Sequence, residues 1–254
     1  MKKTIIALCA ASLIFAGNAY ALHFNGTNTP GTGVVGSKHD MTQYTDISDS
    51  EGRVCAFCHT PHHSITGDPN EYLPLWSHSL TTQTSFTPYK SATFDVTQAP
   101  GYTDGNILAG ASLLCMSCHD GTIAVDQHYG SDANNAGTNK LSNDLFGGTQ
   151  GVGGGGAVGL NGNFSNDHPI GFSYTDYQKT HSSDLNPPST YYAGNHVKRI
   201  EDQLGPGGLF TCATCHDVHN KDNVANTYQG GTTRNYFLLG DNNQSAFCLT
   251  CHNK

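Results

Sequence analysis

The sequence predicts a chain that is mostly irregular coil, with few short α-helices and little or no sheet. Three observations favour this fold class. The 254 residues include 30 glycines and 10 prolines, which interrupt regular elements. Hydrophobic residues make up only 36% of the chain, and many of them lie in an apolar run near the N-terminus. Eight of the nine cysteines recur in pairs within one short motif that is spaced irregularly along the chain.

This motif consists of a cysteine, any two residues, a second cysteine and a histidine. It occurs at 55–59, 115–119, 212–216 and 248–252, and accounts for every cysteine except Cys9. It is the attachment signature of c-type haem, in which both thiols bond to the porphyrin and the imidazole binds the iron. We therefore predict four covalent haems. The predicted attachment cysteines and first iron ligands are Cys55, Cys58, His59, Cys115, Cys118, His119, Cys212, Cys215, His216, Cys248, Cys251 and His252.

Two other interpretations of the cysteines stay open at this point. The eight cysteines could form disulfides, or they could form two cysteine-rich zinc sites. Neither interpretation needs a histidine directly after every second cysteine, so haem is favoured. Four porphyrins would be large, rigid and mostly apolar, and we expect the polypeptide to be wrapped around stacked haems that serve as its core.

The first 21 residues have the pattern of a signal peptide. Lys2 and Lys3 precede an apolar run at 5–15, and Ala-Tyr-Ala at 19–21 fits a cleavage site. Cys9 would be removed with this segment. The run is too short to span a bilayer, and no later stretch is long and apolar enough. We therefore predict a single domain at 22–254, without membrane insertion, exported to the cell exterior or outer surface, with the periplasm as the alternative.

The charge balance excludes one class of partner. The chain carries 12 basic and 20 acidic side chains, for a formal net charge of −8. Binding to nucleic acid needs basic residues that neutralise phosphates. No nucleic-acid partner is expected.

A few local patterns predict order between the motifs. A short ordered segment is expected at 41–47, a helix at 108–118 leading into the second motif, and a short helix at 196–204 that ends at the glycines and proline of 205–208. The glycine-rich stretch at about 131–163 is expected to be a flexible insert.

The second axial ligand of each iron distinguishes electron transfer from catalysis, because an open position can bind small molecules. Met41 is the only methionine outside the signal peptide and the motifs, whereas ten histidines lie outside the motifs. Bis-histidine ligation is therefore predicted. The candidate second ligands are His39, His62, His78, His168, His219 and His23.

The local settings of these candidates differ. His62 and His219 each lie three residues after a motif histidine, so they are expected to reach a neighbouring haem, with His63 as the alternative to His62. His39 precedes Asp40, whose carboxylate could orient the imidazole. Three further histidines are expected at the surface: His128, His181 and His196.

Several stretches around the motifs resemble a known family. They are Cys-Ala-Phe-Cys-His-Thr-Pro-His (55–62), Pro-Leu-Trp-Ser-His (74–78), Cys-Met-Ser-Cys-His-Asp-Gly-Thr (115–122), Asp-His-Pro-Ile-Gly (167–171) and Cys-Ala-Thr-Cys-His-Asp-Val-His (212–219). They are similar to exported multihaem c-type cytochromes, and the haem count and size resemble the tetrahaem extracellular filament cytochromes of metal-reducing bacteria, the OmcE-like nanowires. The resemblance favours His39, His62, His78, His168 and His219 as second ligands.

The resemblance implies electron transfer between haems that are continuous along a polymer of identical subunits. Its implied partners are other cytochromes as electron donor and acceptor, further copies of the chain, and an extracellular metal oxide or a partner cell. Two alternatives remain open: a monomeric periplasmic electron carrier, and a multihaem redox enzyme with one open haem. The electron-carrier interpretation predicts no catalytic residues.

Overall fold

A computed structural model describes residues 24–28, 33–45, 47, 49–62, 64, 73–128, 137, 140, 156–220, 226–227, 233–234 and 236–254. The predicted signal peptide, His23 and His63 lie outside these residues, as does most of the glycine-rich stretch at 131–163. Among the described residues, no helix combines the length and the apolar character that crossing a bilayer requires.

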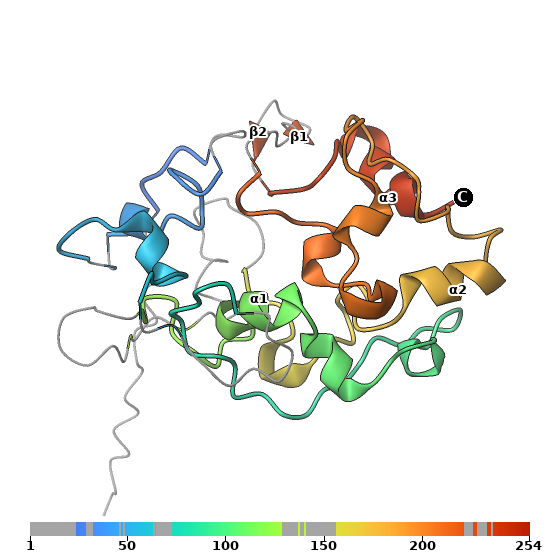
Figure 1. The fold of residues 1–254 in the computed structure, drawn as a ribbon, viewed down its shortest axis with the longest axis horizontal. Coiled ribbons are helices and arrows are strands. Elements are labelled where there is room, and N and C mark those ends of the chain that lie inside the picture. Colours follow the sequence, from blue (N-terminus) through green and yellow to red (C-terminus); the bar gives the residue numbers. More distant parts are fainter. Residues whose placement is uncertain are drawn as a thin grey trace, which may run out of the picture.

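The expectation of little regular structure is confirmed: the described chain is mostly coil with short helical turns (Figure 1). Its α-helices are α1 (Ala111–His119), α2 (Tyr174–Thr180) and α3 (Ala246–Cys251). The 3-10 turns are η1 (Met41–Gln43), η2 (Val54–Phe57), η3 (Val96–Gln98), η4 (Asp104–Leu108), η5 (Leu160–Gly162), η6 (Ile200–Gln203), η7 (Pro206–Gly208), η8 (Cys212–Thr214) and η9 (Asn243–Ser245). One antiparallel pair joins β1 (Asn226–Thr227) to β2 (Thr233–Arg234).

The helix expected at 108–118 is present as α1, but it begins three residues later. Gly110, the residue before α1, has a positive φ of 55°. The backbone is therefore not helical between η4 and α1, and α1 cannot begin earlier. The helix expected at 196–204 is only the four-residue turn η6, and the ordered segment expected at 41–47 contains the three-residue turn η1.

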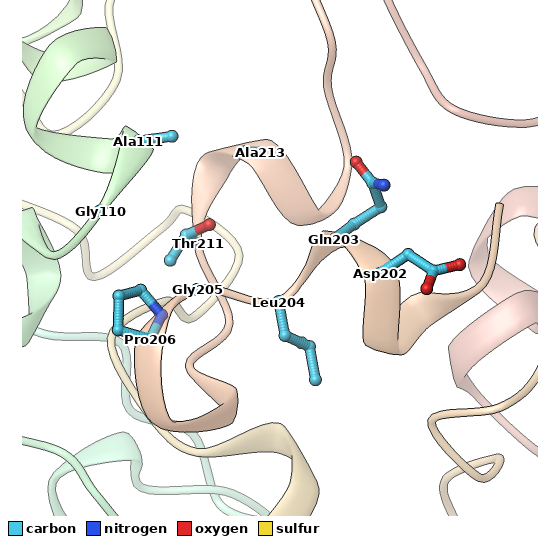
Figure 2. Close-up of a pocket in the computed structure, with 9 residues that line it drawn as sticks. All are labelled: Gly110, Ala111, Asp202, Gln203, Leu204, Gly205, Pro206, Thr211 and Ala213. Carbon is cyan, nitrogen blue, oxygen red and sulfur yellow. The ribbon is translucent and has the colours of Figure 1, made fainter. Parts of the chain in front are cut away.

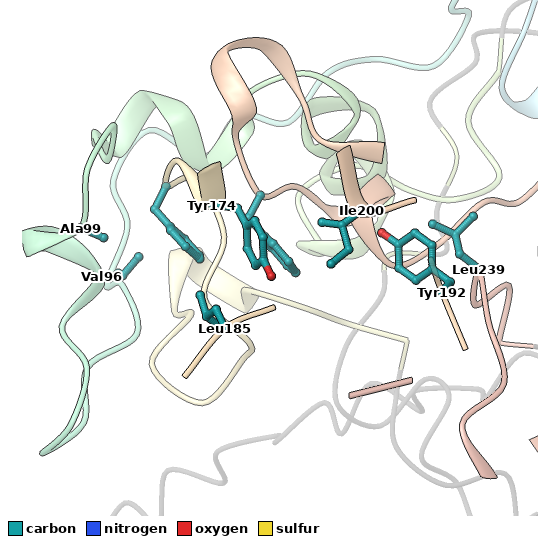
Figure 3. Close-up of a cluster of buried hydrophobic side chains, with 9 residues drawn as sticks. Val96, Ala99, Tyr174, Leu185, Tyr192, Ile200 and Leu239 are labelled. Carbon is teal, nitrogen blue, oxygen red and sulfur yellow. The ribbon is translucent and has the colours of Figure 1, made fainter. Parts of the chain in front are cut away.

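The largest buried cluster among the described residues, which we call the aromatic cluster, combines four aromatic with five aliphatic side chains and lies beside α2 and the third and fourth motifs (Figure 3). Stacked rings hold it together, since Phe172 and Phe210 lie 5.7 Å apart at 11° and Tyr192 and Phe247 lie 5.7 Å apart at 13°. Cys215 and Cys251 pack against its edge. Two smaller clusters lie at Tyr44, Ile47, Phe57 and Val125 and at Ile107, Met116 and Phe164.

Candidate functional site: four cysteine–histidine motifs

The first and third motifs have nearly the same backbone. Each begins with a 3-10 turn, and the second cysteine then has φ of −116° in Cys58 and −110° in Cys215. The amide of the motif histidine donates to the carbonyl of the first cysteine at 2.9 Å in His59 and 3.1 Å in His216. Both cysteines and the histidine are thereby held within a single turn.

A short antiparallel segment fixes each of these histidines; we call residues 74–77 and 236–239 the clamp segments. The Nδ1 of His59 lies 2.7 Å from the carbonyl oxygen of Pro74, and the Nδ1 of His216 lies 2.8 Å from that of Tyr236. A carbonyl only accepts hydrogen bonds, so each Nδ1 carries the proton and each Nε2 keeps its lone pair. This tautomer is the one that binds a metal through Nε2.

The clamp segments match residue for residue. At the first motif, Thr60 N–H donates to the Leu75 carbonyl at 2.8 Å and Ser77 N–H donates to the Cys58 carbonyl at 2.9 Å. At the third motif, the equivalent bonds are Asp217 N–H to Phe237 at 2.8 Å and Leu239 N–H to Cys215 at 3.1 Å. The second residue of each clamp segment is left-handed, with φ of 55° in Leu75 and 58° in Phe237.

The fourth motif is clamped in the same register. Asn186 N–H donates to the Cys251 carbonyl and Asn253 N–H donates to the Asp184 carbonyl, both at 2.8 Å. The second motif differs, because it lies on α1 and its histidine is held by a loop. The Nδ1 of His119 donates to the Gly156 carbonyl, and Val158 N–H donates to the His119 carbonyl at 2.9 Å.

Three motif histidines face a histidine from a distant part of the chain. The ring centres of His119 and His39 lie 5.8 Å apart, those of His59 and His219 lie 6.0 Å apart, and those of His252 and His168 lie 6.3 Å apart. These pairs span long sequence separations, and each contains one of the candidates predicted from the sequence. Two neutral imidazoles that face each other in this way can hold one metal ion between them.

The facing histidines sit in different surroundings. The Nδ1 of His168 donates to the Pro169 carbonyl at 3.0 Å, and the Nδ1 of His219 lies 3.9 Å from the Asp217 carboxylate. The Nδ1 of His39 is buried, and it has no hydrogen-bond partner among the described residues. Burial, reinforced by His119, lowers the pKa of His39 to about 3, so its imidazole is neutral.

The expectation that Asp40 orients His39 is wrong. The Asp40 carboxylate accepts from the amide of Thr42 at 3.2 Å and from that of Gly36 at 2.8 Å. Asp40 therefore caps η1 and closes the loop before it, which are the local bonds that a short acidic side chain makes most readily.

The close approach of two chain segments places His168. Gly171 has φ of 82°, and its amide donates to the Phe210 carbonyl at 2.9 Å. A Cβ at this position would lie 2.8 Å from the Ile107 nitrogen. The glycine of the Asp-His-Pro-Ile-Gly stretch thus lets it lie close to η4, while His168 stacks on Phe210 at 5.1 Å.

The remaining histidines are not brought opposite a motif histidine by any contact that the structure describes. His62 is exposed. His78 is fully buried, and its Nδ1 and Nε2 lie 3.0 and 2.9 Å from the carbonyl oxygens of Ser79 and Ala124. The Nε2 of His78 also lies 3.4 Å from the Cys118 sulfur, so His78 adjoins the second motif.

Three histidines were expected at the surface. The expectation is wrong for His128, which is buried. Its ring packs on Phe57 of the first motif at 4.3 Å, and its Nε2 lies 3.6 Å from the Asp49 carboxylate. His196 is exposed as expected. His181 is partly buried and stacks on Tyr177 at 3.8 Å.

The cysteines of successive motifs lie near one another. All eight described cysteines are free thiols. Contact with the Cys212 thiol, together with burial, raises the pKa of Cys115. Burial and the nearby Cys58 raise that of Cys118, and burial and the nearby Cys251 raise that of Cys215. Cysteines of the first and second, the second and third, and the third and fourth motifs are thus neighbours in space.

No other described feature has the character of an active site. A pocket of about 170 Å³ lies between the start of α1 and the third motif (Figure 2). This is below the roughly 300–1,000 Å³ of typical ligand pockets. Asp202 is the only ionisable residue among the described residues that line it. Within the described chain, no three His, Cys, Asp or Glu side chains are grouped so as to hold a metal ion.

No family model matches the chain, and no curated protein is similar to it.

Proposed function

We propose that this protein transfers electrons through four c-type haems. Each motif would bind one haem, and the chain would be wrapped around the four haems. The thiols of each motif would attach the group, and His59, His119, His216 and His252 would be its first iron ligands. Haem supplies a one-electron ferric/ferrous couple when bound. The residues of the chain set its spacing, its ligands and its access to water.

The observation that carries this proposal is the facing of histidines. With metal–nitrogen bonds of about 2.0–2.1 Å and about 1.1 Å from nitrogen to ring centre, two imidazoles on one metal have centres about 6.3 Å apart. The three observed separations, 5.8, 6.0 and 6.3 Å, fit this arrangement. We assign His39, His219 and His168 as second ligands opposite His119, His59 and His252.

Two features of the chain favour a carrier over an enzyme. A second imidazole closes the iron to small molecules, so it favours electron transfer. The Nδ1 atoms of three motif histidines donate to backbone carbonyls, which fixes the rings and leaves each Nε2 for the iron. The eight described cysteines form no disulfide, and no three of the described His, Cys, Asp or Glu side chains are grouped so as to hold a metal ion, so neither alternative interpretation of the cysteines has support among these residues.

The test is the intact mass and the ferric spectrum of protein secreted by a host that can attach haem. We expect a chain that begins at Leu22 and carries four haems, with low-spin signals from the three facing pairs. A mass without haem contradicts the proposal, and so does zinc bound in its place. A high-spin iron that binds nitrite or peroxide would favour the redox-enzyme alternative.

We further propose that the protein is exported and polymerises into an extracellular filament, with other cytochromes as donor and acceptor. A head-to-tail contact that does not close gives an open filament, and a histidine from another copy could complete a haem. His39 already faces His119 of its own chain, so His23 is the better candidate for such a donor.

Electron microscopy of wild type, His23→Ala and His39→Ala tests the filament proposal. Filaments shortened by His23→Ala are expected, and a wild type that stays monomeric at high concentration with four low-spin haems supports the periplasmic carrier.

A further inference from the structure

Phe237 has a backbone conformation that large residues rarely adopt. Its φ is 58°, in the left-handed region, and its side chain is only 4% exposed. Such a conformation is costly for an aromatic residue, and it persists only where the surroundings enforce it. Residues of this kind concentrate at functional sites, so the contacts of Phe237 are informative.

The left-handed turn at Phe237 brings three groups into place. The carbonyl of the preceding residue, Tyr236, accepts from the Nδ1 of His216, and the carbonyl of Phe237 accepts from the amide of Asp217. The ring of Phe237 packs against that of His39, with the ring centres 4.8 Å apart in an edge-to-face arrangement at 82°. One residue therefore contacts the surroundings of two proposed iron ligands.

His39 depends on packing more than its counterparts do. The Nδ1 atoms of His168 and His219 lie near a carbonyl and a carboxylate respectively, whereas that of His39 has no such partner in the described chain. The rings of Phe237 and His119 are its aromatic neighbours. The orientation of the His39 ring is thus set by shape, and Phe237 provides one wall.

We propose that Phe237 is a positioning residue that couples the imidazole of His39 to that of His216, and so links the second and third haem sites. This inference rests on the proposed function. The coupling passes through packed atoms: a change in the side chain of Phe237 alters the wall against His39, and a change in its backbone alters the carbonyl that holds His216.

The first motif supplies a matched control. Leu75 has the same place in its clamp segment, with φ of 55° and a carbonyl that accepts from Thr60. Its side chain, however, is 54% exposed. Truncation of Leu75 therefore changes the same backbone position without removing a wall from any described imidazole.

The experiment uses the full haem-loaded chain with Phe237→Ala, Phe237→Leu, Leu75→Ala and His39→Ala. Low-spin ferric signals by electron paramagnetic resonance and a redox titration are recorded for each. We expect Phe237→Ala to shift the signals and midpoint potentials of two haems, one of them the haem that His39→Ala converts to high spin. Leu75→Ala, which lies in the clamp segment of the first motif, should leave the signals and potentials of these two haems unchanged.

Phe237→Leu keeps a buried apolar side chain and decides the question if the alanine variant fails to fold. We expect a smaller shift at the same two haems, because the edge of the ring against His39 is lost while the volume is mostly kept. Unchanged signals in a folded Phe237 variant with four haems would overturn the inference, as would an equal shift in Leu75→Ala. Wild-type protein without haem would instead overturn the proposed function.

Discussion

The first and third motifs have the same backbone and the same type of clamp segment, yet their surroundings differ. The third motif lies in the middle of the series, with Cys212 against Cys115 and Cys215 near Cys251. The first lies at one end of the series, where Cys58 lies near Cys118 of the second motif. If the motifs bind haem as proposed, we therefore expect their electronic coupling to follow the position of each motif in the molecule rather than its local geometry.

The supports beneath the two motifs also differ. The first motif rests on an ion pair, in which the partly exposed Arg53 binds the buried Asp49 carboxylate at 2.6 Å and His128 lies beyond it. The third is held by α1 and the aromatic cluster, through Cys212 N–H to the Ser112 hydroxyl at 3.1 Å and the Tyr192 hydroxyl to the Thr214 carbonyl at 2.5 Å. We expect the first to be sensitive to acid and the third to loss of packing.

The largest contrast is expected from removing the thiols. Cys212→Ala with Cys215→Ala should remove one haem and shift the potentials of the haems of the second and fourth motifs, because the third motif adjoins both. Cys55→Ala with Cys58→Ala should remove one haem, shift that of the second motif and, because His219 loses its place opposite His59, also shift that of the third, but it should leave the fourth unchanged. Intact mass and redox titration check this, and equal disturbance by both double variants would contradict the spatial order.

Ligand loss should separate His219 from His62, which occupy equivalent positions after the third and first motifs. His219→Ala should convert one low-spin haem to high spin, because its ring faces His59 at 6.0 Å. His62 is exposed and faces no motif histidine among the described residues, so His62→Ala should keep the spin states of wild type. An equal conversion by His62→Ala would show that the two motifs exchange ligands symmetrically.

Glycine at the left-handed positions tests packing. Phe237→Gly removes a buried ring and should lower the free energy of unfolding by about 3 kcal/mol. Leu75→Gly removes an exposed side chain and relieves a strained backbone, so it should stay within about 1 kcal/mol of wild type. Denaturant titration of the haem-loaded proteins measures both, and a Leu75→Gly variant as unstable as Phe237→Gly would contradict the role of the ring.

Acid should affect the support of the first motif. The side-chain hydrogen bonds from Arg53 lower the pKa of Asp49 from 3.8 to about 2. A lowered carboxyl pKa stabilises the fold above the unfolded value, and this contribution is lost as the pH falls from about 4 to 2. Because solvent screens the partly exposed Arg53 guanidinium, Asp49→Asn should cost about 1 kcal/mol at neutral pH.

Unfolding of wild type and Asp49→Asn between pH 2 and 7 isolates this contribution, since the two curves should converge below pH 2. Asp176→Asn is the matched control, because Asp176 pairs with Lys179 on the surface, with both side chains more than half exposed. It should have little effect. Parallel curves for wild type and Asp49→Asn at all pH values would show that Asp49 does not titrate in this way.

Much of the architecture was predictable because it is local. Glycine and proline content predicted the scarcity of regular elements, and an apolar stretch predicted α1 to within three residues. The start of α1 was missed because η4 ends at Leu108, and the extended Ala109 and the positive-φ Gly110 separate it from α1. The burial of His128 was missed as well, since its polar neighbours Asp49 and Arg53 lie more than 70 positions away along the chain.

The sequence by itself determined the four motifs, because two thiols and an imidazole within one helical turn need only short-range geometry. It also limited the candidates for the proposed second ligands to a small set of histidines. Only the tertiary structure decided which of these face His59, His119 and His252, since each pair joins segments that are 80 or more positions apart. Such contacts depend on how loops pack and where carbonyls hold each ring, and no local pattern encodes them.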